Sequence, residues 1–292
     1  MEGRAKPVAW SSASGRNNIE DALRRVGGLP DAEIDLAETA LLIAALDQPK
    51  APLDRYVHHL SLLTRDIAEE GARLAAHDSL AGRLEAINGI VFGRYGYQGD
   101  EESYDDLDNA NLMRVIDRRC GLPVALGILY IHSARAQGWP IEGLAFPGHF
   151  LLRMECGGER AIIDPFNKGA RREPEALRGL LKLVSGNDVE LRPDHYAPCG
   201  NRQILLRLQN NRKLRQLQAE RGDAALETLE TMIMIAPSQP DLWREAGLLN
   251  AELSNLRAAI VSLENFLQLA PSNHRERPAA EQYLRQLRNK LN

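Results

Sequence analysis

The strongest hydrophobic pattern in the chain is an apolar run that begins directly after Pro123. Most residues from Val124 to Ala136 are apolar on every side of a helical projection, which predicts a helix that is buried all round. Pro123 suits the first helical position, where its missing N–H has no partner to lose, and Gly138 suits the left-handed residue that ends a helix. The sequence therefore marks both ends of a buried helix.

A period of two replaces this pattern after the helix and predicts a β-hairpin with strands at about 149–155 and 160–164, joined by a turn at Cys156-Gly157-Gly158-Glu159. Gly157-Gly158 supplies the positive φ of a tight turn. The expected pairs are Glu155–Arg160, Met154–Ala161, Leu152–Ile163 and Leu151–Asp164. In this register His149 and Asp164 are diagonal neighbours, roughly 7–8 Å apart at the backbone, which an imidazole and a carboxylate can bridge. A three-residue loop would instead put them on opposite faces.

Helical periodicity fills the region before the buried helix. It predicts helices at about 31–46, with Asp31 as the cap, at 53–74 and at 78–92, and residues 1–30 are expected to form a loose leader. Residues 93–111 are expected to form a solvated loop over the candidate functional site near His149 and Asp164. His58, His59 and His77 could suggest a metal, but adjacent helical residues point to different sides, so a solvated face is the preferred interpretation.

The last third of the chain contains a repeat. Ala236-Pro237 recurs as Ala270-Pro271, an offset of 34 residues, which is typical of tetratricopeptide repeats. A polar helix at about 201–219 is expected to complete the array because no single unit can bury its apolar face alone. We expect a solvated or docking face on this helix, formed by Arg202, Arg207, Arg212, Lys213 and Arg215. The groove of the repeats is the expected site for a protein or peptide partner.

Composition narrows the functional classes. The 292 residues carry a net charge of −4, which disfavours nucleic acid and acidic membrane surfaces as partners. The three cysteines fit no zinc or disulfide spacing, so they are expected to be reduced thiols in a cytoplasmic protein. The apolar run at 124–131 is far shorter than the roughly 20 residues of a membrane span. No metal or cofactor motif is recognised, and the oligomeric state stays open.

Candidate chemistry centres on His149 and Asp164. A carboxylate that orients an imidazole forms two thirds of a nucleophile relay, and the third member would be a thiol at a helix N-terminus. The strings Arg-Arg-Cys-Gly-Leu-Pro (118–123), Phe-Pro-Gly-His-Phe-Leu-Leu-Arg (146–153) and Ile-Asp-Pro-Phe (163–166) resemble the bacterial SirB1 family over about residues 88–170. This family has a transglutaminase-like core of the papain-like superfamily.

The resemblance implies an α+β, mostly helical fold, with a buried helix on a small antiparallel sheet at 31–195 and a tetratricopeptide array at 200–292. It also marks Asn88, Pro123 and Phe146 as pocket residues. In active transglutaminase-like enzymes the nucleophilic cysteine stands about fifteen residues before the glycine that closes the helix. Here Pro123 occupies that place, and Cys120 lies three residues upstream.

Two functions are consistent with this pattern. The first is a degenerate transglutaminase-like protein that acts as a binding or regulatory module. The second is a cysteine-dependent amide hydrolase or acyl transferase with Cys120 as nucleophile, His149 as base and Asp164 as orienting residue. The proline at the nucleophile position favours the first.

Overall fold

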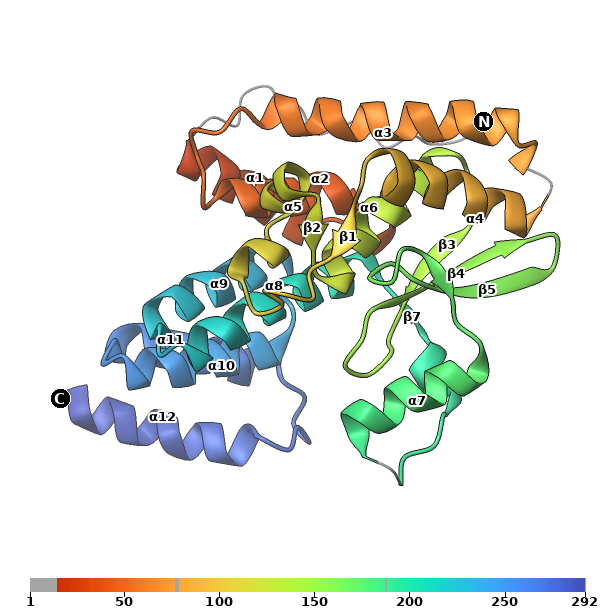
Figure 1. The fold of residues 1–292 in the computed structure, drawn as a ribbon. Helices are drawn as coiled ribbons and strands as arrows, with labels where there is room; N and C mark the ends of the chain where they lie inside the picture. Colours follow the sequence, from red (N-terminus) through yellow and green to blue (C-terminus); the bar gives the residue numbers. More distant parts are fainter. Residues whose placement is uncertain (1–14, 77–78, 187, 292) are drawn as a thin grey trace. The chain divides into compact units, whose positions relative to one another are not determined.

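The computed structural model describes residues 15–76, 79–186 and 188–291, and Figure 1 shows their helices and strands. These residues form two compact units. Unit 1 contains Pro30–Leu208, and unit 2 contains Asn17–Leu29 together with the chain from Gln209 onward. The boundary lies inside one helix, α8 (Asn201–Gln218).

Unit 1 is built around α6 (Pro123–Ala136), which contacts four helices and two strands of the sheet. The surrounding helices are α2 (Leu36–Ala45), α3 (Leu53–Arg73), α4 (Leu80–Asn88) and α5 (Leu112–Arg118). Pro123 stands at the N-terminal end of α6 and Gly138 has a φ of 71°. The predicted buried helix is thus confirmed together with its two end signals.

A five-stranded antiparallel sheet packs against α6 in unit 1 (Figure 1). Its strands are β3 (Ile141–Leu144), β4 (Leu151–Cys156), β5 (Glu159–Asp164), β6 (Ala170–Arg171) and β7 (Pro198–Cys199), in the order β6-β5-β4-β3-β7. Glu155 pairs with Arg160 and Leu152 with Ile163, as predicted. Gly157 and Gly158 have φ values of 57° and 86°, so the two-glycine turn sets the register.

Shorter elements complete unit 1. They are η2 (Asp31–Glu33), the π-helical η4 (Gly89–Arg94), β1 (Gln98–Gly99), η5 (Leu107–Ala110), β2 (Cys120–Gly121), α7 (Pro174–Ser185) and η6 (Pro193–Tyr196). The predicted helix at 78–92 is therefore α4 followed by a π-helical turn, and Asp78 lies outside the described residues. β1 and β2 pair in parallel.

Asp31 does not cap the first helix of unit 1, contrary to the sequence-based expectation. Asp35 caps α2 by accepting the backbone N–H of Glu38 at 2.9 Å. Asp31 instead accepts the backbone N–H groups of Asn201 and Arg202, both at 2.8 Å. These are orphan donors of the first turn of α8, so a residue distant in sequence fixes where α8 begins.

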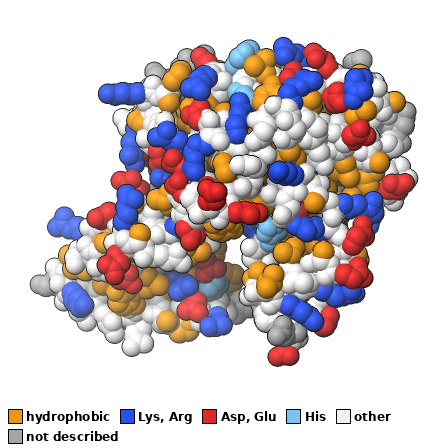
Figure 2. All heavy atoms as spheres, viewed as in Figure 1, with side chains coloured by type: hydrophobic (Ala, Val, Ile, Leu, Met, Phe, Trp, Pro, Cys, Tyr) orange, Lys and Arg blue, Asp and Glu red, His pale blue; other side chains and the backbone are white. Residues whose placement is uncertain are grey.

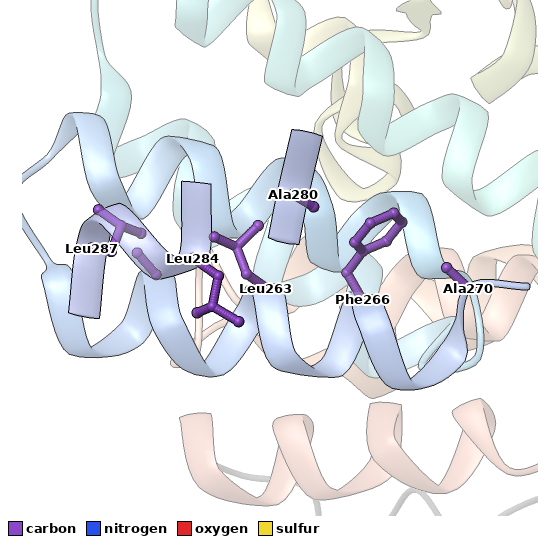
Figure 3. Close-up of a cluster of buried hydrophobic side chains, with 7 residues drawn as sticks. Leu263, Phe266, Ala270, Ala280, Leu284 and Leu287 are labelled. Atoms are coloured by element: carbon purple, nitrogen blue, oxygen red, sulfur yellow. The ribbon is translucent and has the colours of Figure 1, made fainter. Parts of the chain in front are cut away.

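Unit 2 is all-helical and carries the repeat. Besides the second half of α8 it contains α1 (Arg16–Gly27), α9 (Gly222–Ile235), α10 (Pro240–Glu252), α11 (Leu256–Leu269) and α12 (Arg277–Leu291). Figure 3 shows part of its core, where apolar side chains of α11 and α12 gather between the two helices. The members of this cluster are Ala259, Leu263, Phe266, Ala270, Ala280, Leu284 and Leu287.

The loose leader expected over residues 1–30 is wrong for its second half, because Arg16–Gly27 forms α1. Ile19, Leu23 and Val26 of this helix are buried, and the close approach of Gly27 to the backbone of Met234 leaves no room for a Cβ. A helical apolar stripe therefore packs into unit 2. Residues 1–14, including Trp10, lie outside the described part of the chain.

Candidate functional site

His149 and Asp164 meet in unit 1, as the hairpin register predicts. His149 Nε2 lies 2.9 Å from Asp164 Oδ1. His149 lies in the bend that precedes β4, and Asp164 is the last residue of β5. Gly148 has a φ of 68° and the backbone N–H of His149 donates to the carbonyl of Pro147 at 2.8 Å, so a tight turn, and not the strand itself, presents the imidazole.

Asp164 is fully buried and accepts five further hydrogen bonds. The donors are the backbone N–H groups of Phe166 and Asn167, the side-chain amide of Asn167, and Nε and Nη2 of Arg172. Burial alone would raise the pKa of Asp164, but the hydrogen bond and charge of His149, with hydrogen bonds from Arg172 and Asn167, lower it to about 2. An ionised carboxylate can only accept, so His149 Nε2 carries the proton of this contact.

The loop of His149 is also held from α8. Arg207 Nη2 donates to the carbonyl oxygens of Phe146 at 2.9 Å and His149 at 2.8 Å. Its guanidinium lies 5.6 Å from the centre of the Phe150 ring. That ring fits a slot between Gly127 of α6 and Gly143 of β3, each of which would clash with it if it carried a Cβ. The residues on both sides of the imidazole are thereby fixed.

Sequence reasoning missed Arg172 and misplaced Arg207. Arg172 follows a strand of two residues, which is too short for alternation to assign a face. Arg207 was expected on a solvated or docking face of the helix, but it is flanked by Leu205, Leu206 and Leu208. This apolar setting was the available signal of burial. Lys213 of the same expected face is 4% exposed and pairs with Glu245.

Cys120 lies on β2, which pairs with β1 and so brings Asp100 close to it. The buried carboxylate of Asp100 accepts hydrogen bonds from Ser103 and Arg118. Burial, and then the charge of Asp100, raises the pKa of Cys120. Among the described residues, no hydrogen bond joins the Cys120 sulfur to His149.

The three expected pocket residues are placed separately. Asn88 accepts from the hydroxyl of Tyr130 and donates to the carbonyl of Gly169, so it ties α6 to the turn after β5. Pro123 is buried at the start of α6. Phe146 is 1% exposed in a cluster with side chains of α7.

A surface pocket of about 490 Å³ opens beside Cys120. Its lining residues are Gln98, Gly99, Asp100, Glu101, Glu102, Cys120, Phe166, Asn167 and Lys168. Phe166 meets the His149 ring edge-on at 6.3 Å, and Asn167 donates to Asp164. The pocket therefore adjoins the Asp164 network, but neither His149 nor any of the three expected pocket residues lines it.

His59 is not simply part of a solvated face. Arg119 Nη1 lies 2.8 Å from His59 Nε2 and donates to the hydroxyl of Tyr97. Burial, and then the charge of Arg119, lowers the pKa of His59 to about 4. This histidine is thus a neutral member of a half-buried polar cluster. His58 is exposed, and His77 lies outside the described residues.

The described residues contain neither a candidate metal site nor a candidate membrane span. No group of three or more His, Cys, Asp or Glu side chains within 15–76, 79–186 and 188–291 could hold a metal ion. None of the helices in that part of the chain is long and apolar enough to cross a membrane. On the face shown in Figure 2, positive and negative side chains are interspersed.

Comparison with protein families gives the class of each unit. A model of the transglutaminase-like superfamily matches residues 54–210, and a tetratricopeptide-repeat model matches residues 213–288. The protein is thus a transglutaminase-like domain followed by tetratricopeptide repeats. The two matches meet inside α8.

Curated relatives narrow this class. A UPF0162 protein of Xylella fastidiosa is 31% identical over 84% of this chain and 87% of its own length. A UPF0162 protein of Vibrio cholerae is 30% identical over 85% and 89%, and SirB1 of Salmonella typhimurium is 24% identical over 82% and 87%. The chain belongs to this family of UPF0162 and SirB1 proteins within the transglutaminase-like superfamily.

Proposed function

We propose that unit 1 is a transglutaminase-like domain without thiol chemistry and that the protein is a binding or regulatory module. The observation that carries this proposal is the setting of Cys120: Asp100 and Cys120 line the same pocket, and His149 does not line it. A thiol must be deprotonated to attack a carbonyl carbon. Burial and the neighbouring carboxylate both act against deprotonation of Cys120.

The residue at the start of α6 supports the same proposal. The resemblance to active transglutaminase-like enzymes puts their nucleophile where this chain has Pro123. Proline has no side-chain atom that can attack a carbonyl. The hydrogen bonds of Asp164 then stabilise the fold around His149, and no thiolate is required next to the imidazole.

The repeats supply the proposed binding surface, for a protein or a peptide. Stacked repeats present extended surfaces that bind other chains. Unit 2 also exposes large apolar side chains, which are more costly to leave in water than polar ones. They are Leu214, Leu217, Leu248, Val261, Leu269 and Leu291.

A second function is favoured by one observation, the intact pair of His149 and Asp164 at 2.9 Å. In this alternative the protein is a cysteine-dependent amide hydrolase or acyl transferase. Cys120 would be the nucleophile, His149 the base and Asp164 the orienting residue. The thiol would have to reach the imidazole during the reaction.

Alkylation by iodoacetamide separates the two functions. The rate at Cys120 would be followed by peptide mass spectrometry across pH 6–10, in the unchanged protein, in His149→Ala, and in the exposed-histidine control His58→Ala. Without a relay, the thiol reacts slowly at neutral pH and the rate rises only in the alkaline range, since its pKa is raised. His149→Ala then leaves the profile unchanged.

Rapid alkylation of Cys120 at neutral pH that disappears in His149→Ala but persists in His58→Ala would overturn the proposal. Cys156 and Cys199 are 8% and 7% exposed. Their rates in the same samples report whether a variant has loosened the fold.

A further inference from the structure

The loop that carries His149 is fastened by a residue from a helix far along the chain. Arg207 Nη2 donates to two carbonyl oxygens, those of Phe146 and His149, which lie at the start and near the end of the loop. One guanidinium thus holds both sides of a turn that contains Gly148 in the left-handed region. Each of these bonds is charge-assisted and stronger than one between neutral groups.

Arg207 is half-buried, so protein groups must replace part of the water around its charge. Burial lowers the pKa of Arg207, because a charged guanidinium loses favourable hydration when water is excluded. The two carbonyl dipoles, together with the face of the Phe150 ring at 5.6 Å, replace part of that hydration. The loop and the guanidinium therefore stabilise each other in one arrangement.

His149 is held at two points, its ring by Asp164 and its backbone carbonyl by Arg207. We propose that Arg207 is a positioning residue for His149: it fixes the backbone from which the ring reaches Asp164, and so keeps the proton of that contact on Nε2. This inference goes beyond the proposed function. It concerns what holds the imidazole, and it stands whether or not a thiol reaction takes place.

Arg207 lies close to the end of unit 1 along the chain. Arg207 is the penultimate residue of unit 1, and α8 continues without a break into Gln209–Gln218 of unit 2. The helix that positions His149 is therefore the same helix that enters the repeat unit.

Three variants of the full chain test the proposal. Arg207→Met keeps the length and apolar stem of the side chain but removes its donors. Arg207→Lys keeps the charge as a single point. The matched control is Arg83→Met, because Arg83 also donates to a backbone carbonyl, that of Glu155 at 3.0 Å, and lies 5.7 Å from an aromatic ring, that of Trp139.

Two readouts report on the histidine itself. Long-range ¹H–¹⁵N spectra give the tautomer of His149, and hydrogen exchange gives the protection of its amide, which donates to Pro147. In Arg207→Met we expect a mixture of tautomers and amide exchange faster by roughly ten- to a hundredfold, as the loss of a charge-assisted hydrogen bond implies. Arg207→Lys should lie between this variant and the unchanged protein, and Arg83→Met should leave both readouts unchanged.

The proposal is overturned if Arg207→Met folds and keeps the single tautomer and the slow exchange. It is also overturned if Arg83→Met alters His149 to the same extent, since the effect would then be general loosening. If Arg207→Met does not fold, Arg207→Lys decides by the same two readouts. Failure here leaves the alkylation result at Cys120 untouched, so the two proposals are tested separately.

Discussion

Asp164 is the residue on which the polar contacts around His149 converge, and its replacement by asparagine should be costly. The change leaves the half-buried guanidinium of Arg172, bound at 2.7 and 3.0 Å, without the fully buried charge that it pairs with. Breaking a buried ion pair in this way costs about 3–5 kcal/mol. We expect Asp164→Asn to lower the free energy of unfolding in urea by that amount, and Asp188→Asn, at an exposed position, by less than about 0.5 kcal/mol.

The difference in the free energy of unfolding between the unchanged protein and Asp164→Asn should depend on pH. The pKa of Asp164 falls from 3.8 to about 2 on folding. A lowered carboxyl pKa stabilises the folded state fully above the unfolded pKa, and the stabilisation is lost as the pH falls towards 2. Between pH 6 and pH 2 the unchanged protein should lose roughly 2 kcal/mol more than Asp164→Asn. Parallel pH curves for the two proteins would contradict this assignment.

At the scale of residues, the sequence could predict contacts only between residues that a short stretch of chain connects. His149 and Asp164 lie on either side of one short turn, so the turn glycines determine their separation. Arg207 and Asp31 act on segments 58 or more residues away, and no local pattern encodes such contacts. The proximity of Asp100 to Cys120 was missed for the same reason, since β1 and β2 join only in the folded chain.

At the scale of elements, the close contact between α6 and β4 gives a test of packing. A Cβ at Gly127 would lie 2.4 Å from Cε1 of Phe150, and that ring is confined by Gly143 on its other side. We expect Gly127→Ala to destabilise unit 1 by about 1–3 kcal/mol in thermal or urea unfolding, despite the better helix propensity of alanine. The matched control is Gly179→Ala in α7, where no atom lies within 4 Å.

Gly179→Ala should stabilise the protein slightly, by up to about 1 kcal/mol, because only the propensity changes. Equal effects of the two substitutions would mean that the slot around Phe150 relaxes freely. If Gly127→Ala lowers the hydrogen-exchange protection of the His149 amide and Gly179→Ala does not, the packing of α6 also stabilises the loop that carries His149.

Helices and strands with strong periodicity were predictable. Short elements, and a helix that packs against residues far along the chain, were not. The buried α6, the hairpin of β4 and β5, and the repeat helices follow from patterns that span ten or more residues. α1 carries a clear apolar stripe of Ile19, Ala22, Leu23 and Val26, but its packing surface in unit 2 lies some two hundred residues downstream. The π-helical turn after α4 has no sequence signature that separates it from an ordinary helix end.

At the scale of the whole molecule, the division into two units predicts that a substitution in the core of one unit destabilises that unit and leaves the other unchanged. Phe266 is fully buried in the cluster between α11 and α12 (Figure 3). Phe266→Ala should cost unit 2 about 3–5 kcal/mol, through lost burial and the cavity that remains. Val261→Ala, on the same helix and 54% exposed, should cost far less.

Hydrogen exchange followed by mass spectrometry locates the damage. In Phe266→Ala, amides of α10–α12 should exchange much faster, while those of the β4–β5 hairpin keep their protection, since each unit has its own apolar core. The second half of α8 should follow unit 2, and its first turn should follow unit 1, where Asp31 binds it. Equal loss of protection in the hairpin would mean that the chain unfolds as one cooperative body, with the shared helix as the connection.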